Sequence, residues 1–94
     1  MKLPKKIEVS GFILSIEYKD KLGSGEEERW GEYVNNKMTL VKGMPPARKK
    51  EIFLHEFIHF IEDIYRLNLS EEDVSCIALG MLQLLNNKKI GWDY

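Results

Sequence analysis

Short alternating runs of apolar and polar residues fill the first half of the chain and predict β-strands. Residues 6–18, KIEVSGFILSIEY, are rich in β-branched and aromatic residues, and Gly11 among them indicates a bulge or bend. Two further runs, RWGEYV and KMTLVK, flank the pair Asn35 and Asn36. This arrangement predicts a hairpin with a short Asn-rich turn.

The second half of the chain changes to a helical period. Two prolines, at 45 and 46, suit the first turn of a helix, where the backbone N–H that proline lacks has no helical partner. Residues 47–67 then form a helical pattern that no glycine or proline interrupts. We therefore predict a first helix over about Ala47 to Leu67.

A second helix is predicted from about Glu71 to Asn86. Ser70, with Asp73 three residues later, matches the spacing of a capping box. The element order of strand, hairpin, helix, helix predicts an α+β fold, in which a small antiparallel sheet (strand plus hairpin) packs on two helices. We expect residues 1–94 to form a single domain.

Composition excludes several classes of partner. The chain is 44% hydrophobic and 31% charged, with a formal net charge of -1, so nothing in its charge predicts binding to nucleic acid or to an anionic membrane. No run of about 18 apolar residues predicts a membrane span. The single cysteine, Cys76, excludes an internal disulfide and fits a reducing compartment. We expect a cytoplasmic protein, and no sequence pattern sets its oligomeric state.

The first predicted helix has one apolar side, and His55 and His59 lie nearly opposite it. At about 100° per residue, the apolar side chains gather together. They are Phe53, Phe57, Phe60, Ile61 and Ile64, with Leu54, Ile58 and Tyr65 at the margin. Because residues four apart are neighbours on a helix, the two imidazoles can converge on one point.

The stretch HEFIH, residues 55–59, has the H-E-x-x-H pattern of a zinc site. Two neutral imidazoles at this spacing bind Zn²⁺, and the glutamate after the first of them serves as general base. The alternative is a polar helix face in water, on which these residues need no explanation. Both histidines of the chain lie in the motif, and its x positions are uncharged. We therefore predict Zn²⁺ on His55 and His59, with Glu56 as the base.

A catalytic zinc usually has three protein ligands and one open position. After His59, only Glu62 and Tyr65 have suitable spacing on the same helix. Glu62 lies a full turn beyond the pair, which suits a supporting or a surface role better than direct ligation. On the second helix, Glu71 falls at the edge of the apolar face, whereas Glu72 falls on the far side. We predict Glu71 as the third ligand.

An H-E-x-x-H motif with a glutamate on a later helix resembles the gluzincin group of zinc metallopeptidases. The whole chain is similar to small phage and bacterial gluzincin-type proteins, from WGEY…TLV through FLHEFIHFIED to LSEEDVSCIALGMLQLL. The resemblance implies a zincin-like domain with Zn²⁺ held by His55, His59 and Glu71. It also implies that Glu56 deprotonates a zinc-polarised water, which attacks a peptide bond of a protein or peptide substrate.

Two residues that commonly assist catalysis in gluzincins, an aspartate that orients a histidine and a donor to the oxyanion, are missing or unassigned. Ser75 stands where they place an aspartate that orients a histidine. The donor to the oxyanion could be Tyr18, Tyr33 or Tyr65, of which Tyr65 is expected in the core. In zincins an edge strand beside the site usually binds an extended peptide by strand addition, and the predicted hairpin is the candidate for that strand. We expect its Trp30 and Tyr33 to be core residues.

Two other functions remain open for this sequence. One is a zincin-like domain that binds zinc but is catalytically weak or inactive, and acts as a structural or regulatory binding module. The other is a regulatory protease that cuts a single repressor, an activity attributed to some phage-borne relatives.

Overall fold

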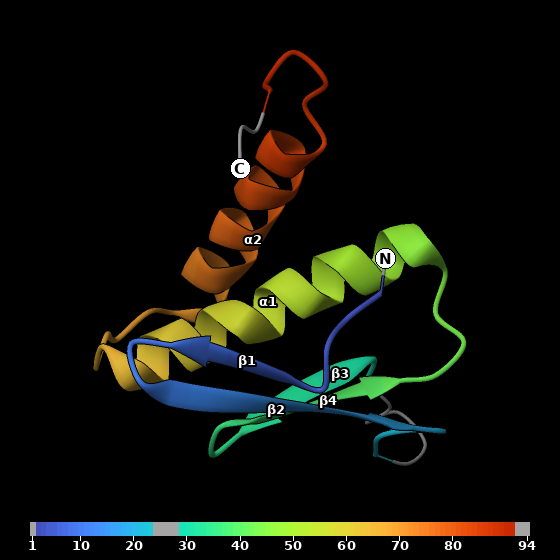
Figure 1. Ribbon diagram of the computed structural model, residues 1–94, viewed down its shortest axis with the longest axis vertical. Helices are drawn as coiled ribbons and strands as arrows, with labels where there is room; N and C mark the ends of the chain where they lie inside the picture. The colour runs from blue at the N-terminus through green and yellow to red at the C-terminus, as the bar shows by residue number, and fades with distance from the viewer. Residues whose placement is uncertain (1, 24–28, 92–94) are drawn as a thin grey trace.

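The structure is a computed structural model that describes residues 2–23 and 29–91. It has the predicted α+β fold, a four-stranded sheet with two helices (Figure 1). In chain order the elements are β1 (Lys6–Val9), β2 (Phe12–Lys19), β3 (Gly31–Val34), β4 (Lys37–Val41), α1 (Pro46–Ile64) and α2 (Glu71–Leu85). Across the described residues, neither helix combines the length and apolar character that crossing a bilayer requires.

The sheet is mixed, so the prediction of an antiparallel sheet was wrong for one pair of strands. The strand order is β1-β2-β4-β3, and β2 pairs with β4 in parallel. The predicted strand over residues 6–18 is two strands, because Ser10 and Gly11 both have positive φ, 51° and 82°, and turn the chain back. This hairpin occupies one edge of β2 and leaves the other edge for β4.

The predicted hairpin around the two asparagines is confirmed. β3 and β4 are antiparallel, and Asn35 and Asn36 have φ values of 48° and 64°. Positive φ at both central residues is typical of the tight turn whose twist matches a two-stranded hairpin. Since β4 pairs with β2 on its other side, β3 is left at the edge of the sheet.

The first helix ends three residues before its predicted limit. Arg66 has a positive φ of 55°, and the N–H of Leu67 donates to the carbonyl of Glu62 at 2.9 Å. The N–H of Arg66 donates to the Asp63 carbonyl at 3.4 Å, which completes a Schellman-type helix end. Sequence inspection missed this end because arginine occupies the position that glycine usually marks.

The predicted capping box at the start of α2 is confirmed. The Ser70 hydroxyl accepts a hydrogen bond from the Asp73 N–H at 3.0 Å, and the Asp73 carboxylate accepts one from the Ser70 N–H at 3.2 Å. This reciprocal pair makes Glu71 the first residue of the helix.

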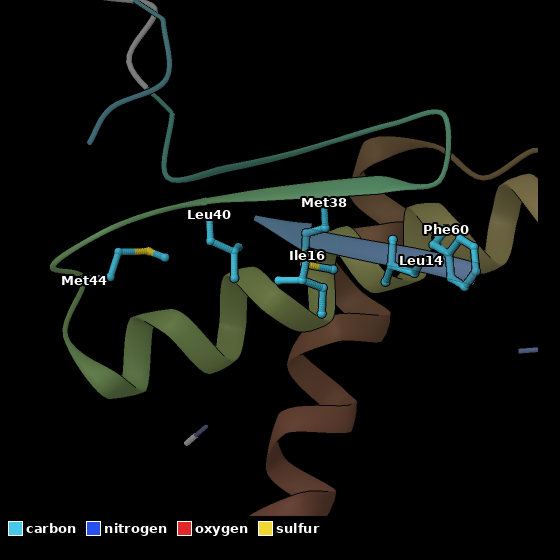
Figure 2. Close-up of a cluster of buried hydrophobic side chains, with 6 residues drawn as sticks. All are labelled: Leu14, Ile16, Met38, Leu40, Met44 and Phe60. Atoms are coloured by element: carbon cyan, nitrogen blue, oxygen red, sulfur yellow. The ribbon is translucent and has the colours of Figure 1, made fainter. Parts of the chain in front are cut away.

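α1 lies between the sheet and α2 (Figure 1). On the sheet side, six buried side chains form one core cluster (Figure 2). They are Leu14, Ile16, Met38, Leu40, Met44 and Phe60. On the other side, Leu54 and Ile58 pack with Val74 and Ala78 of α2. Leu54 and Ile58 were placed at the margin of the apolar side, but each is only 5% exposed because α2 covers a second face of α1.

β3 approaches α1 closely at Gly31. A Cβ at this position would lie 2.6 Å from Cγ2 of Ile52 and 3.4 Å from Cγ of Glu56. The absence of a side chain therefore lets the edge strand lie directly against the helix that carries both histidines.

We expect Gly31→Ala to lower the free energy of unfolding by about 1–3 kcal/mol, because the added methyl overpacks a close contact between strand and helix. Urea denaturation measures this change. Gly91→Ala is the control, since a Cβ there meets no atom within 4 Å. Equal effects of the two substitutions would contradict the close approach.

Candidate metal centre

His55 and His59 lie one turn apart in the middle of α1. Their ring centroids are 5.1 Å apart, and each side chain is only 23% exposed. A helix face open to water would leave side chains of this size largely exposed. β3 and the first turn of α2 border this face of α1, so the imidazoles line a cleft instead.

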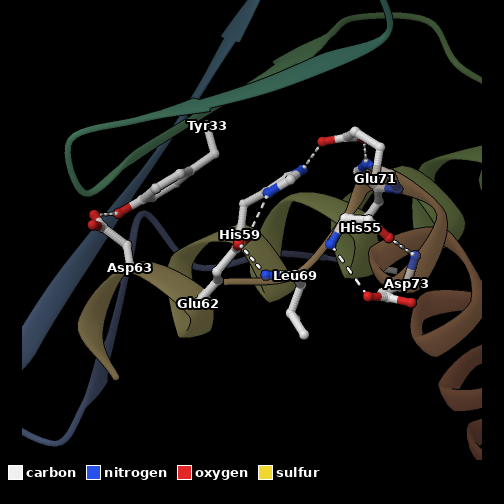
Figure 3. A network of polar contacts seen from close by, with 9 residues as sticks. Tyr33, His55, His59, Glu62, Asp63, Leu69, Glu71 and Asp73 are labelled. Carbon is white, nitrogen blue, oxygen red and sulfur yellow. Dashed lines mark hydrogen bonds and ion pairs between the residues drawn. The ribbon is translucent and has the colours of Figure 1, made fainter. Parts of the chain in front are cut away.

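Glu71, the first residue of α2, contacts both histidines. Its Oε2 lies 3.2 Å from Nε2 of His55, and its Oε1 lies 2.9 Å from Nε2 of His59 (Figure 3). One ligand atom from each of the three residues lies within 4.8 Å of the others. Glu72 is exposed and does not belong to this cluster, the only one of its kind found among residues 2–23 and 29–91.

The donor types of the cluster, and its two distances to Glu71, suit a zinc ion. Zinc commonly takes imidazole nitrogens and carboxylate oxygens at about 2.0–2.2 Å in a tetrahedron, which separates neighbouring ligand atoms by about 3.3 Å. The distances of 2.9 and 3.2 Å between the imidazoles and Glu71 are close to that separation. The Glu71 side chain is 74% exposed, so the centre faces the open side of the cleft.

Glu62 contacts His59, which fits the supporting one of the two roles that its position on the helix left open. Its Oε1 lies 3.2 Å from Nδ1 of His59, and its Oε2 accepts a hydrogen bond from the Leu69 N–H at 2.9 Å. The first contact favours an imidazole that carries its proton on Nδ1 and leaves Nε2 free for a metal. The second contact fixes the segment that leads into α2. Glu62 therefore links a histidine to the helix that provides Glu71.

Glu56 is a buried carboxyl beside this cluster. Glu56 is 8% exposed and lines the same cleft as the two histidines. Burial raises the pKa of the Glu56 carboxyl above its ordinary range, while the charges of His55 and His59 act in the opposite direction. A carboxyl in this position is suited to take up and release a proton.

The cleft has a volume of about 960 Å³ and lies between β3, α1 and the start of α2. Trp30 and Tyr33 line it, so the expectation that both are core residues was wrong for Trp30, which is 44% exposed. The reason is the edge position of β3, which has a neighbouring strand on one side only. Tyr33 is half-buried, and its ring packs against Phe60 at 5.9 Å.

Of the three tyrosines considered as oxyanion donors, Tyr33 lines the cleft, whereas Tyr18 and Tyr65 are not among its lining residues. The Tyr33 hydroxyl donates to Oδ2 of Asp63 at 2.7 Å. Burial and this hydrogen bond raise the pKa of Tyr33 to about 12. The pair ties the edge strand to α1, as Figure 3 shows. Tyr65 is 52% exposed, so its predicted core position was wrong.

Sequence reasoning missed two residues of this region, Gly31 and Asp63. Asp63 stands four residues after His59, a spacing that places it on the same side of the helix, and this was the signal that could have indicated it. Gly31 gave only the weaker signal of a glycine within a strand pattern.

No family model, no curated protein and no solved structure matches this chain.

Proposed function

We propose that this protein is a zinc-dependent metallopeptidase of the gluzincin type. The observation that carries the proposal is the convergence of His55, His59 and Glu71 beside the buried carboxyl of Glu56. Three protein ligands with a carboxyl base beside them are typical of a hydrolytic zinc site of the H-E-x-x-H type.

In this proposal His55, His59 and Glu71 hold Zn²⁺ through two nitrogens and one carboxylate. When bound, the ion supplies a Lewis acid that polarises a carbonyl and activates water. Glu56 takes a proton from the attacking water and delivers it to the leaving amine. Burial raises the pKa of this carboxyl, which makes its carboxylate form a stronger base toward the water.

The edge strand β3 suits an extended peptide as substrate. The Val41 N–H donates to the Trp30 carbonyl at 2.9 Å, and hydrogen-bonded pairs alternate along an antiparallel ladder. The backbone groups of Gly31 and Tyr33 therefore point to the open edge. A peptide that adds to this edge would lie beside the metal ligands, since both line one cleft.

We expect Glu62→Gln to weaken zinc binding by about 10–100-fold, the usual effect of removing a carboxylate that orients a metal-bound histidine. An amide still fills the space but brings no negative charge to the imidazole. Competition with a chromophoric chelator measures the zinc dissociation constant directly and requires no peptidase activity.

Glu51→Gln is the matched control for Glu62→Gln. Glu51 lies on the same helix and pairs with Arg48 at 3.6 Å, and it is not among the residues that line the cleft. If both substitutions left zinc affinity unchanged, the supporting role of Glu62 would be excluded.

A second candidate function is a zinc-binding domain with little or no catalysis, in a structural or regulatory role. One observation favours it, because Tyr33, a tyrosine that lines the cleft, has its hydroxyl engaged by Asp63. The exposed free thiol of Cys76 is compatible with the cytoplasm for either function.

A further inference from the structure

Two arginines line the cleft, Arg29 and Arg66, and their surroundings differ. Arg29 pairs with Glu32 at 3.1 Å, so its charge is largely neutralised within the chain. Arg66 is exposed, and no carboxylate among residues 2–23 and 29–91 forms an ion pair with its guanidinium. Arg66 therefore brings a positive charge to the cleft that the described part of the chain does not neutralise.

The two carboxylates in the last turn of α1, just before Arg66, are engaged by other groups. Glu62 contacts Nδ1 of His59 at 3.2 Å, and Asp63 accepts the hydrogen bond of the Tyr33 hydroxyl at 2.7 Å. Either carboxylate would have to leave its partner to pair with Arg66. A carboxylate from outside the chain can pair with Arg66 and leave both internal contacts in place.

Arg66 stands just after a helix, at the position where glycine is the usual residue. Its φ of 55° lies in the left-handed region, which a side chain disfavours and glycine does not. Glycine would therefore suit the backbone of this turn better than arginine does. A positive charge here also interacts favourably with the negative end of the α1 dipole. A role in the helix end and a role in binding a substrate predict different results when Arg66 is replaced by glycine.

Arg66 lies at one end of the cleft, and β3 leads toward that end. A Cβ at Gly31 would lie 3.4 Å from Cγ of Glu56, whereas Tyr33 reaches Asp63, nearly two turns further along α1. The strand and the helix therefore run in the same direction. A peptide that adds to the open edge of β3 would pass from the metal ligands toward Arg66.

The spacing between Arg66 and the metal ligands sets the position of the side chain that it can bind. Arg66 follows His59 by seven residues, which is about 10 Å at 1.5 Å per residue. An extended peptide advances about 3.3 Å per residue. A side chain that pairs with Arg66 would therefore stand about three residues from the peptide group beside His59.

We propose that Arg66 determines substrate specificity by selecting peptides with an aspartate or glutamate about three residues from the cleaved bond, on one side of that bond. The inference rests on the proposed peptidase function. A guanidinium binds a carboxylate through as many as two parallel hydrogen bonds, which a neutral amide cannot match in charge. The side chains of aspartate and glutamate supply that carboxylate.

Cleavage of a tryptic digest of bacterial proteins by the zinc-loaded protein tests this preference, with the cleaved bonds identified by mass spectrometry. We expect aspartate and glutamate to be enriched over asparagine and glutamine by about 3–10-fold at about three residues from the bond, the range expected for an exposed charge-assisted contact. The enrichment is expected to fall as the salt concentration rises, because salt screens exposed charges.

Arg66→Gly is expected to remove the enrichment without lowering the Tm, because glycine relieves the backbone at the position where it removes the charge. Arg66→Lys keeps the charge but not the planar fork of donors, so part of the enrichment is expected to remain. Arg48→Gln is the control for loss of a positive charge on α1. Arg48 pairs with Glu51 at 3.6 Å and is not among the residues that line the cleft.

Cleavage without an acidic preference, or a preference that survives in Arg66→Gly, would overturn this inference and leave the peptidase function in place. An equal preference on both sides of the bond would also overturn it, because Arg66 lies at one end of the cleft only. No cleavage of any peptide in the digest would contradict the proposed function itself, and with it the inference.

Discussion

Glu56→Gln is expected to lower kcat for peptide hydrolysis by about 10²–10⁴-fold, the contribution typical of a general base. The amide has the shape of the carboxyl but cannot accept the proton of the attacking water. Zinc affinity is expected to stay within a few-fold of the wild type, because Glu56 is not among the three converging ligands. Cleavage of fluorescein-labelled casein measures the activity, and metal analysis measures the bound zinc.

The same pair of measurements separates the two candidate functions. Glu51→Gln is the control for a change of charge on α1, since it alters an exposed ion pair on the same helix. Zinc bound equally by the wild type and by Glu56→Gln, with cleavage by neither, would exclude the enzyme and leave the zinc-binding module.

Glu71→Ala is expected to weaken zinc binding by more than the 10–100-fold that loss of a supporting residue causes, because it removes a direct ligand. The remaining two imidazoles keep their positions on α1, so some affinity persists. Chelator competition measures the dissociation constant, and the rise in Tm on addition of zinc gives a second reading, since a ligand that binds only the folded state stabilises it.

Glu72→Ala is the matched control for Glu71→Ala. Both residues are acids in the first turn of α2, so both substitutions remove a similar favourable interaction with the helix dipole, about 0.3–1 kcal/mol. Only Glu71 contacts the histidines. Loss of zinc on Glu72→Ala but not on Glu71→Ala would overturn the choice of ligand, and a wild type that gains no stability from zinc would exclude the site.

Local sequence signals were sufficient for most of the elements. The helical period, the two prolines and the Ser70 capping box placed both helices, and Asn35 with Asn36 placed one hairpin. The parallel pairing of β2 with β4 was missed because it joins strands separated by about 20 residues and by another strand. At Gly11 we predicted a bulge or bend and not a turn between two strands, because the local residues suit either structure.

In the candidate site too, some positions follow from local sequence and others depend on how the helices are connected. His55, Glu56 and His59 are neighbours within two helical turns, so their common region follows from helix geometry alone. The side of α2 that carries Glu71 also follows from its period. The contacts of 2.9 and 3.2 Å between Glu71 and the histidines depend on the connection between the helices, which ends α1 at a Schellman turn and begins α2 at its capping box.

The two helices, the hairpin and the spacing of the histidines follow from local sequence, because each depends on residues within a few turns or strand positions of one another. The burial of Glu56 against β3, the two contacts of Glu62 and the place of Trp30 at the cleft arise from tertiary packing. Such contacts form between elements that are far apart in the chain. Their packing energy depends on the shapes of the two surfaces and on how closely they approach, as at Gly31. No local pattern encodes such contacts.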